Sequence, residues 1–127
     1  MLHYSHRLYC GVRTQIQRHM AAVTQRDIIN VAQSLVPTEQ DTYVKINALN
    51  RLLCYQRGGH EDRAIRRKFD PIMIEFPNGN EYSCVTYYQA LEIIHDAKAQ
   101  RNVYADEARA IFKRMYAEYW TQPTQSI

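Results

Sequence analysis

The chain has 127 residues, of which 46% are hydrophobic and 23% are charged, and its formal net charge is +3 at pH 7. This length suits one domain covering 1–127, and the composition is that of a folded globular protein, which excludes a largely disordered chain. The longest unbroken apolar stretch, residues 20–23, is far too short to cross a membrane, so no transmembrane helix is expected.

The N-terminal 26 residues contain four arginines and no acidic residue, and their apolar residues have the spacing of one helix face. Arginines and glutamines interrupt every candidate for the apolar centre of a secretory signal. The segment is compatible with an organelle import signal, a basic surface or a first core helix, and the sequence leaves these alternatives open. The apolar stripe comprises Leu8, Tyr9, Val12, Ile16, Met20 and Val23.

Two further helices are expected in the first half of the chain. Thr24 and Asp27 can cap a helix over 25–35, which Pro37 ends. A longer helix, capped by Thr38 or by Asp41, is expected to follow and to run to about Arg57, since its apolar residues recur at helical spacing. Its buried face is expected to contain Tyr43, Ile46, Leu49 and Leu53.

The segment 71–86 is predicted to form an antiparallel hairpin. Two runs of alternating side chains flank Asn78 and Gly79, and an Asn-Gly pair in this setting is a strong hairpin signal. In a two-residue turn both of these residues take a positive φ. Such a turn would pair Phe76 with Glu81 and place polar residues opposite apolar ones, so a bulge or a longer loop is the alternative.

Two helices are expected after the hairpin. Thr86 and Gln89 can form a capping box for the first of them, and Asn102 separates it from the second. The predicted fold class is therefore α+β: a mostly helical single domain of about five helices, with one antiparallel hairpin at 71–86 between the third and fourth. The stripes of the last two helices are Tyr87, Ala90, Leu91, Ile94 and Ala97, then Tyr104, Ala108, Ile111, Met115 and Tyr119.

Positive charge is concentrated in the centre of the chain. Residues 51–68 contain six Lys or Arg residues and two acidic residues, so their charge of +4 exceeds that of the whole chain. Such a cluster favours an acidic partner, either nucleic acid or an acidic protein face. The alternative is a solvated loop beside a helix end. The candidate binding residues are Arg51, Arg57, Arg63, Arg66, Arg67 and Lys68.

The order of the expected elements is also that of a winged helix-turn-helix. A helix over 25–35, a turn at Pro37, a helix over 38–57 and a hairpin would follow one another, with the basic cluster before the hairpin. Glu39 and Asp41 count against DNA binding in this arrangement, because they would lie at the groove and repel phosphates. The hairpin tip also lacks a cation.

Tyrosine is the compositional outlier, with ten residues against three phenylalanines and one tryptophan. Tyrosine is common at protein interfaces because it combines apolar area with a hydrogen-bonding tip. The aromatic residues of the last helix cover more than one face, which favours contact with a protein partner; the alternative is a helix wedged into its own core. The candidate interface residues are Phe112, Tyr116, Tyr119 and Trp120.

No catalytic, metal or cofactor site is predicted. His3, His6 and Cys10 have a spacing that suits zinc on a helix, but a fourth ligand is missing. The His-Glu-Asp run at 60–62 follows two glycines, and neighbours in such a loop are rarely held in the orientation that acid-base catalysis requires. The four glycines of the chain cannot assemble a phosphate-binding loop.

The expected function is that of a small non-enzymatic interaction protein, a regulator or adaptor. Its basic segment would bind nucleic acid or an acidic protein, and its last helix would bind a protein partner. The competing hypothesis is a structural accessory subunit of a large assembly, with an import-like N-terminus. Three widely spaced cysteines indicate a reducing intracellular compartment, including an organelle matrix. The sequence predicts no oligomeric state.

Overall fold

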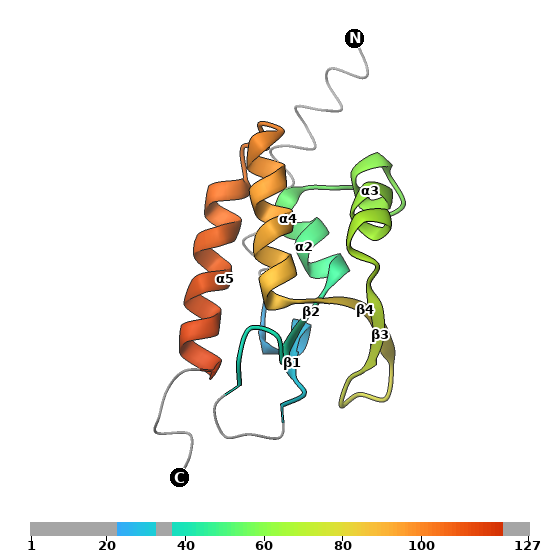
Figure 1. Ribbon diagram of the computed structural model, residues 1–127, viewed down its shortest axis with the longest axis vertical. Helices are drawn as coiled ribbons and strands as arrows, with labels where there is room; N and C mark the ends of the chain where they lie inside the picture. Colours follow the sequence, from blue (N-terminus) through green and yellow to red (C-terminus); the bar gives the residue numbers. More distant parts are fainter. Residues whose placement is uncertain (1–22, 33–36, 121–127) are drawn as a thin grey trace.

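The computed structural model describes residues 23–32 and 37–120, with side chains up to residue 118. Within these ranges the chain forms four α-helices and one four-stranded antiparallel sheet (Figure 1). The expected N-terminal helix lies outside the described residues, apart from Val23. In chain order the elements are η1 (Gln25–Asp27), β1 (Ile28–Asn30), β2 (Thr42–Lys45), α2 (Ile46–Leu53), α3 (His60–Phe69), β3 (Ile72–Glu75), β4 (Glu81–Thr86), α4 (Tyr87–Ala99) and α5 (Ala105–Trp120).

The sheet has the strand order β1-β2-β4-β3, so the two central strands come from distant parts of the chain. Val44 of β2 lies opposite Ile28 of β1 on one side and Val85 of β4 on the other. Each central strand runs directly into a helix, and these helices, α2 and α4, both pack against β2 and β4. In Figure 1, α4 lies between α5 and α3.

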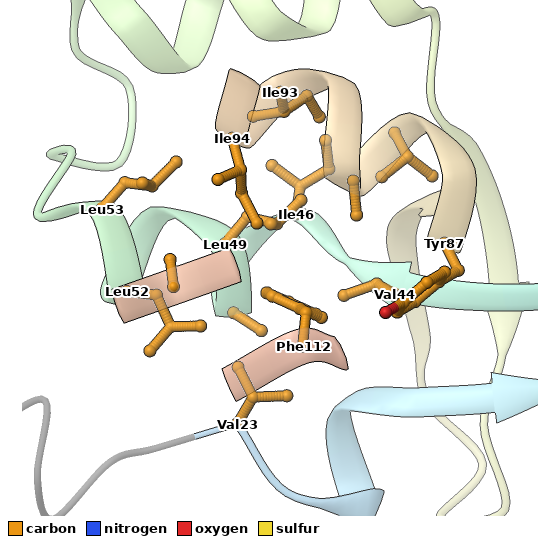
Figure 2. Packing of buried hydrophobic residues seen from close by; sticks show 14 of the residues in the cluster. Val23, Val44, Ile46, Leu49, Leu52, Leu53, Tyr87, Ile93, Ile94 and Phe112 are labelled. Carbon is orange, nitrogen blue, oxygen red and sulfur yellow. The ribbon is translucent and has the colours of Figure 1, made fainter. Parts of the chain in front are cut away.

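The hydrophobic core lies between the sheet and the helices. Because side chains of a strand alternate between two faces, Val44 and Val85 point together into this core and Lys45 points to the opposite face. Figure 2 shows the side chains of α2, α4 and β2 meeting around Phe112 of α5. The fully buried large side chains include Val44, Ile46, Leu49, Leu52, Leu53, Val85, Ile93, Ile94 and Phe112.

The predicted fold class is wrong about the segment 25–35. The capping pair is present, since Thr24 accepts a hydrogen bond from Arg26 and Asp27 accepts one from the Thr24 amide. It closes only the single turn of η1, and the chain then extends into β1. Ile28 and Ile29 are β-branched and lose side-chain freedom in a helix, while pairing with β2 supplies their backbone hydrogen bonds.

The predicted helix over 38–57 is also wrong, because its first part is a strand. Thr42–Lys45 pairs with both β1 and β4, and the helix begins only at Ile46. The stripe of Ile46, Leu49 and Leu53 is buried as predicted. The helix ends before the two glycines, at Cys54, whose φ of 61° is left-handed.

The hairpin is present as β3 and β4, but it is not an isolated element between two helices. β4 also pairs with β2, which makes the hairpin one half of the four-stranded sheet. Its register differs from that of a two-residue turn, because Glu75 lies opposite Glu81. The Phe76 amide donates to the Asn80 carbonyl, so the loop has three residues, and only its last, Gly79, has a positive φ. The expectation that Asn78 shares this conformation is therefore wrong.

Gly79 provides a test of the hairpin geometry. Its φ is +86°, and a Cβ added there would meet no atom within 4 Å, so a side chain would be disfavoured by backbone strain rather than by a clash. Gly79→Val is expected to lower the free energy of unfolding by about 1 kcal/mol or more in urea denaturation. Gly79→Asn is the control and should lose less, because Asn tolerates left-handed backbone. Equal losses in the two variants would contradict this account.

Candidate nucleic-acid interface

The basic segment contains a helix, α3, that the sequence analysis treated as a loop. Gly59 precedes it, Glu61 and Asp62 lie in its first turn, and cations fill its last turn. This distribution complements the helix macrodipole, with acids near the N-terminus and bases near the C-terminus. Asp70, at a φ of 49°, ends the helix. The charge order within 60–69 was therefore the signal that could have identified the helix.

Asp62 links α3 to the residues that precede it through hydrogen bonds. The residue is 2% exposed, and its carboxylate accepts hydrogen bonds from Asn50 Nδ2 at 2.8 Å, from the Gly58 amide at 2.8 Å and from Arg66 Nε at 3.0 Å. Burial, the largest single influence, raises the pKa of Asp62. The hydrogen bonds from Gly58, Asn50 and Arg66 together outweigh it and hold the pKa below its usual value. Asp62 therefore stays ionised at the junction of α2 and α3.

Three of the six candidate cations are neutralised within the protein. Arg51 Nη2 lies 3.1 Å from Asp27 Oδ2, and Arg66 pairs with Asp62 one turn earlier on α3. The remaining pair joins Lys68 to Asp96 of α4 across 2.7 Å, and this hydrogen bond raises the pKa of Lys68 above its usual value. These cations have internal structural partners, so they offer less charge to an external ligand.

The other three cations, Arg57, Arg63 and Arg67, form no ion pair with any described residue. All three are exposed. On α3, the exposed residues His60, Arg63 and Arg67 follow at steps of three and four, which places them on one stripe of the helix. The buried residues of α3 lie on its other side. We use the name α3 basic surface for the exposed cations Arg63 and Arg67 of this helix together with Arg57 of the preceding connection.

The α3 basic surface lies on the second of two consecutive helices, which residues 54–59 connect, and a hairpin follows. The chain runs from β2 through α2, a short connection and α3 into the β3–β4 hairpin, and β4 returns to lie between β2 and β3 (Figure 1). The two helices predicted for this arrangement, over 25–35 and 38–57, are wrong, because these segments contain β1 and β2. Glu39 and Asp41 precede β2 and do not belong to the basic helix. The hairpin tip, residues 77–80, carries no cation.

The C-terminal helix uses two of its four candidate interface residues inside the protein. Phe112 is 0% exposed in the main core, and Tyr116 lies against the ring of Tyr87 with centroids 4.5 Å apart. The hydroxyl of Tyr116 also donates to the Pro37 carbonyl oxygen at 3.1 Å. Neither side chain is therefore a free surface anchor, and contact with a protein through this helix would fall to Tyr119 and Trp120, whose side chains lie outside the described part.

Of the residues that suggested other chemistry, the structure describes only His60, Glu61 and Asp62. His60 and Glu61 line a cleft of about 390 Å³ between α3 and α4, whereas Asp62 is held by its own three donors. Among the described residues no group of His, Cys, Asp and Glu could hold a metal ion, and the zinc candidates His3, His6 and Cys10 lie outside them. In the same residues no helix has both the length and the apolar character needed to cross a membrane.

The comparisons with known proteins identify no relative. No family model, no curated protein and no solved structure matches the chain. The function of the α3 basic surface is therefore inferred from the residues and geometry of this chain alone.

Proposed function

We propose that the chain is a non-enzymatic nucleic-acid-binding regulator or adaptor whose α3 basic surface contacts the phosphates. The observation that carries the proposal is that α3, the helix after α2 and before the hairpin, presents exposed arginines that form no ion pair with a described residue. In a winged helix-turn-helix, which has this element order, the second helix enters the major groove of DNA and flanking cations bind phosphates.

Among the cations of α3, Arg63 is the one whose positive charge contributes least to the stability of the helix. Arg66, Arg67 and Lys68 lie in the last turn of α3, where positive charge is favoured by the helix macrodipole. Arg63 lies in the middle of the helix and one turn from Arg67, a like-charge spacing that mildly destabilises a helix. An external polyanion would relieve this repulsion, which supports a binding role for the pair.

Nucleic acid is favoured over an acidic protein face by the surrounding architecture. A lone basic helix would suit either partner, but this one follows another helix and leads into a hairpin, which is the element order of a winged helix-turn-helix. Because the hairpin tip lacks cations, we expect most of the electrostatic affinity for nucleic acid to come from Arg57, Arg63 and Arg67. Glu75 and Glu81 of the hairpin would oppose close contact with phosphates.

The double substitution Arg63→Gln/Arg67→Gln tests the proposal. Binding of a fluorescent 30-base-pair DNA duplex is measured by anisotropy at several salt concentrations. The unmodified chain should bind at low salt, and its affinity should fall as salt rises, because neutralised phosphates release counterions. The variant should bind more weakly, and the slope of log affinity against log salt should become shallower by about 2.

The matched control is Arg109→Gln/Lys113→Gln, which removes two exposed cations one turn apart on α5. It changes the net charge of the chain by the same amount, so a larger effect at Arg63 and Arg67 isolates the location of the contact. Equal losses in the two variants would show only a general effect of charge. Binding to polyglutamate without binding to DNA or RNA would replace nucleic acid by an acidic protein partner.

A further inference from the structure

A second surface lies at the end of the sheet where β2 ends, β1 begins and the hairpin tip projects. A pocket of about 980 Å³ opens there. One wall is formed by residues 24–30, which include η1 and β1, and another by Phe76, Pro77, Asn78 and Tyr82 of the hairpin. Lys45 and Arg51 complete its lining, and none of its residues belongs to the α3 basic surface.

Lys45 is the unusual residue of this pocket. Its side chain is 13% exposed, and its ammonium lies 3.8 Å from the centroid of the Tyr82 ring and 4.7 Å from that of Phe76. The rings attract the charge through their faces but offer no oxygen lone pair. The nearest carboxylate oxygen, Asp27 Oδ1, is 3.9 Å away, too far for a hydrogen bond.

No described residue therefore accepts a hydrogen bond from Lys45 Nζ. An ammonium has three N–H donors, and Lys45 Nζ is not among the fully buried atoms that lack a partner, so its donors are accessible from the pocket. Because Lys45 lines the pocket, an acceptor that enters the pocket can reach these donors. The side chain is thus held in place by its ring contacts, with its N–H donors accessible from the pocket.

The charges around Lys45 favour an anion as that acceptor. Asp27 Oδ2 already accepts from the Thr24 amide and from Arg51, both at 3.1 Å. Arg26 also lines the pocket and forms no ion pair with a described residue. The pocket is lined by three cations and one carboxylate, so it carries a net charge of +2; the cations are Arg26, Lys45 and Arg51, and the carboxylate is that of Asp27.

We propose that this pocket binds a small phosphate monoester, with its phosphate on Lys45 and its organic part along Ile29 and Pro77. A phosphate monoester carries a charge of about −1.5 to −2 at pH 7 and three acceptor oxygens, which match the charge of the pocket and the three donors of Lys45. The volume exceeds the needs of a bare phosphate and lies in the range of small-molecule sites. The same phosphate chemistry could come from a nucleic-acid backbone, and the experiment separates the two sources.

Phenyl phosphate is the probe, and its binding to the full chain is followed by ¹H–¹⁵N NMR. The expected result is a saturable change at the amides of residues 24–30, 45 and 76–82, with tighter binding than for inorganic phosphate or benzoate. Lys45→Met removes the ammonium and leaves an unbranched apolar side chain, one heavy atom shorter, beside the rings. It should weaken phenyl phosphate by about tenfold or more, as expected for a charge-assisted hydrogen bond.

Lys113→Met on α5 is the matched control and should leave the affinity unchanged. Thermal unfolding verifies that each variant is folded. If Lys45→Met does not fold, Arg26→Gln, which alters an exposed side chain, gives a second test. Equal weakening by the variants at 45 and 113, or no spectral change at millimolar phenyl phosphate, would overturn the proposal. So would a loss of DNA affinity in Lys45→Met without binding of phenyl phosphate, since the phosphate contacted would then be that of nucleic acid. A failure of the DNA experiment on Arg63 and Arg67 leaves this result unaffected.

Discussion

Replacing Phe112 with alanine is expected to lower the free energy of unfolding by about 3–5 kcal/mol. The side chain is 0% exposed and lies where the side chains of α2, α4 and β2 converge (Figure 2). Its removal loses the transfer energy of a large aromatic ring and leaves a cavity that these well-packed neighbours cannot fill. Since a domain of this size is stable by only about 5–15 kcal/mol, the variant should unfold at a much lower urea concentration.

Two nearby substitutions serve as controls for Phe112. Lys113→Ala alters the next residue, which is exposed, and should change stability by less than about 0.5 kcal/mol. Tyr116→Phe removes only the hydrogen bond to the Pro37 carbonyl and should cost about 1 kcal/mol. If Phe112→Ala instead left stability intact and impaired binding to a partner, the residue would be an interface anchor and its assignment to the core would be wrong.

The elements that the sequence predicted correctly are those defined by neighbouring residues. The capping box of α4 forms as expected, since Thr86 Oγ1 accepts from the Gln89 amide and Gln89 Oε1 accepts from the Thr86 amide. The stripe of α2 and the hairpin signal around Gly79 are also local patterns. Each of these features depends on residues three or four apart, which the sequence shows directly.

The elements that were missed depend on distant partners or on very few buried residues. β2 has only four residues, and it is a strand because β4, some 40 positions later, supplies its hydrogen bonds. Its alternation of buried Thr42 and Val44 with half-buried Tyr43 and Lys45 was a short signal within a longer helical pattern. The helix α3 buries few residues, chiefly Asp62 and Ile65, so it has almost no apolar stripe to detect.

The basic segment was predictable as a composition but not as a surface. Its six cations are visible in the sequence, yet Asp27 lies 24 residues before Arg51 and Asp96 lies 28 residues after Lys68. Only the tertiary structure shows that these pairs form, and so which cations remain available. The Lys45 pocket was missed for the same reason, because Asp27, Lys45 and Tyr82 meet only when β1, β2 and the hairpin are assembled.

Asp62→Asn is expected to lower the free energy of unfolding by about 2–3 kcal/mol near neutral pH. Three donors converge on the carboxylate, and an amide in its place would turn its own N–H groups toward at least one of them. The loss is smaller than for a fully buried ion pair, because one third of the Arg66 side chain is exposed. Asp96→Asn is the control: its partner Lys68 is largely exposed, so less than about 1 kcal/mol should be lost.

The contribution of Asp62 should also depend on pH in a defined direction. The folded pKa lies below the unfolded value of about 3.9, so the folded state favours the ionised carboxylate and gains its stabilisation above that pH. As the pH falls through the folded pKa, the stabilisation is lost, and the difference in unfolding free energy between the unmodified chain and Asp62→Asn should shrink. Urea denaturation between pH 7 and pH 2 measures this difference. If the difference in unfolding free energy already vanishes above pH 5, burial outweighs the hydrogen bonds and the pKa of Asp62 is raised. The three hydrogen bonds to Asp62 would then not be what holds α3, with Arg63 and Arg67, in place.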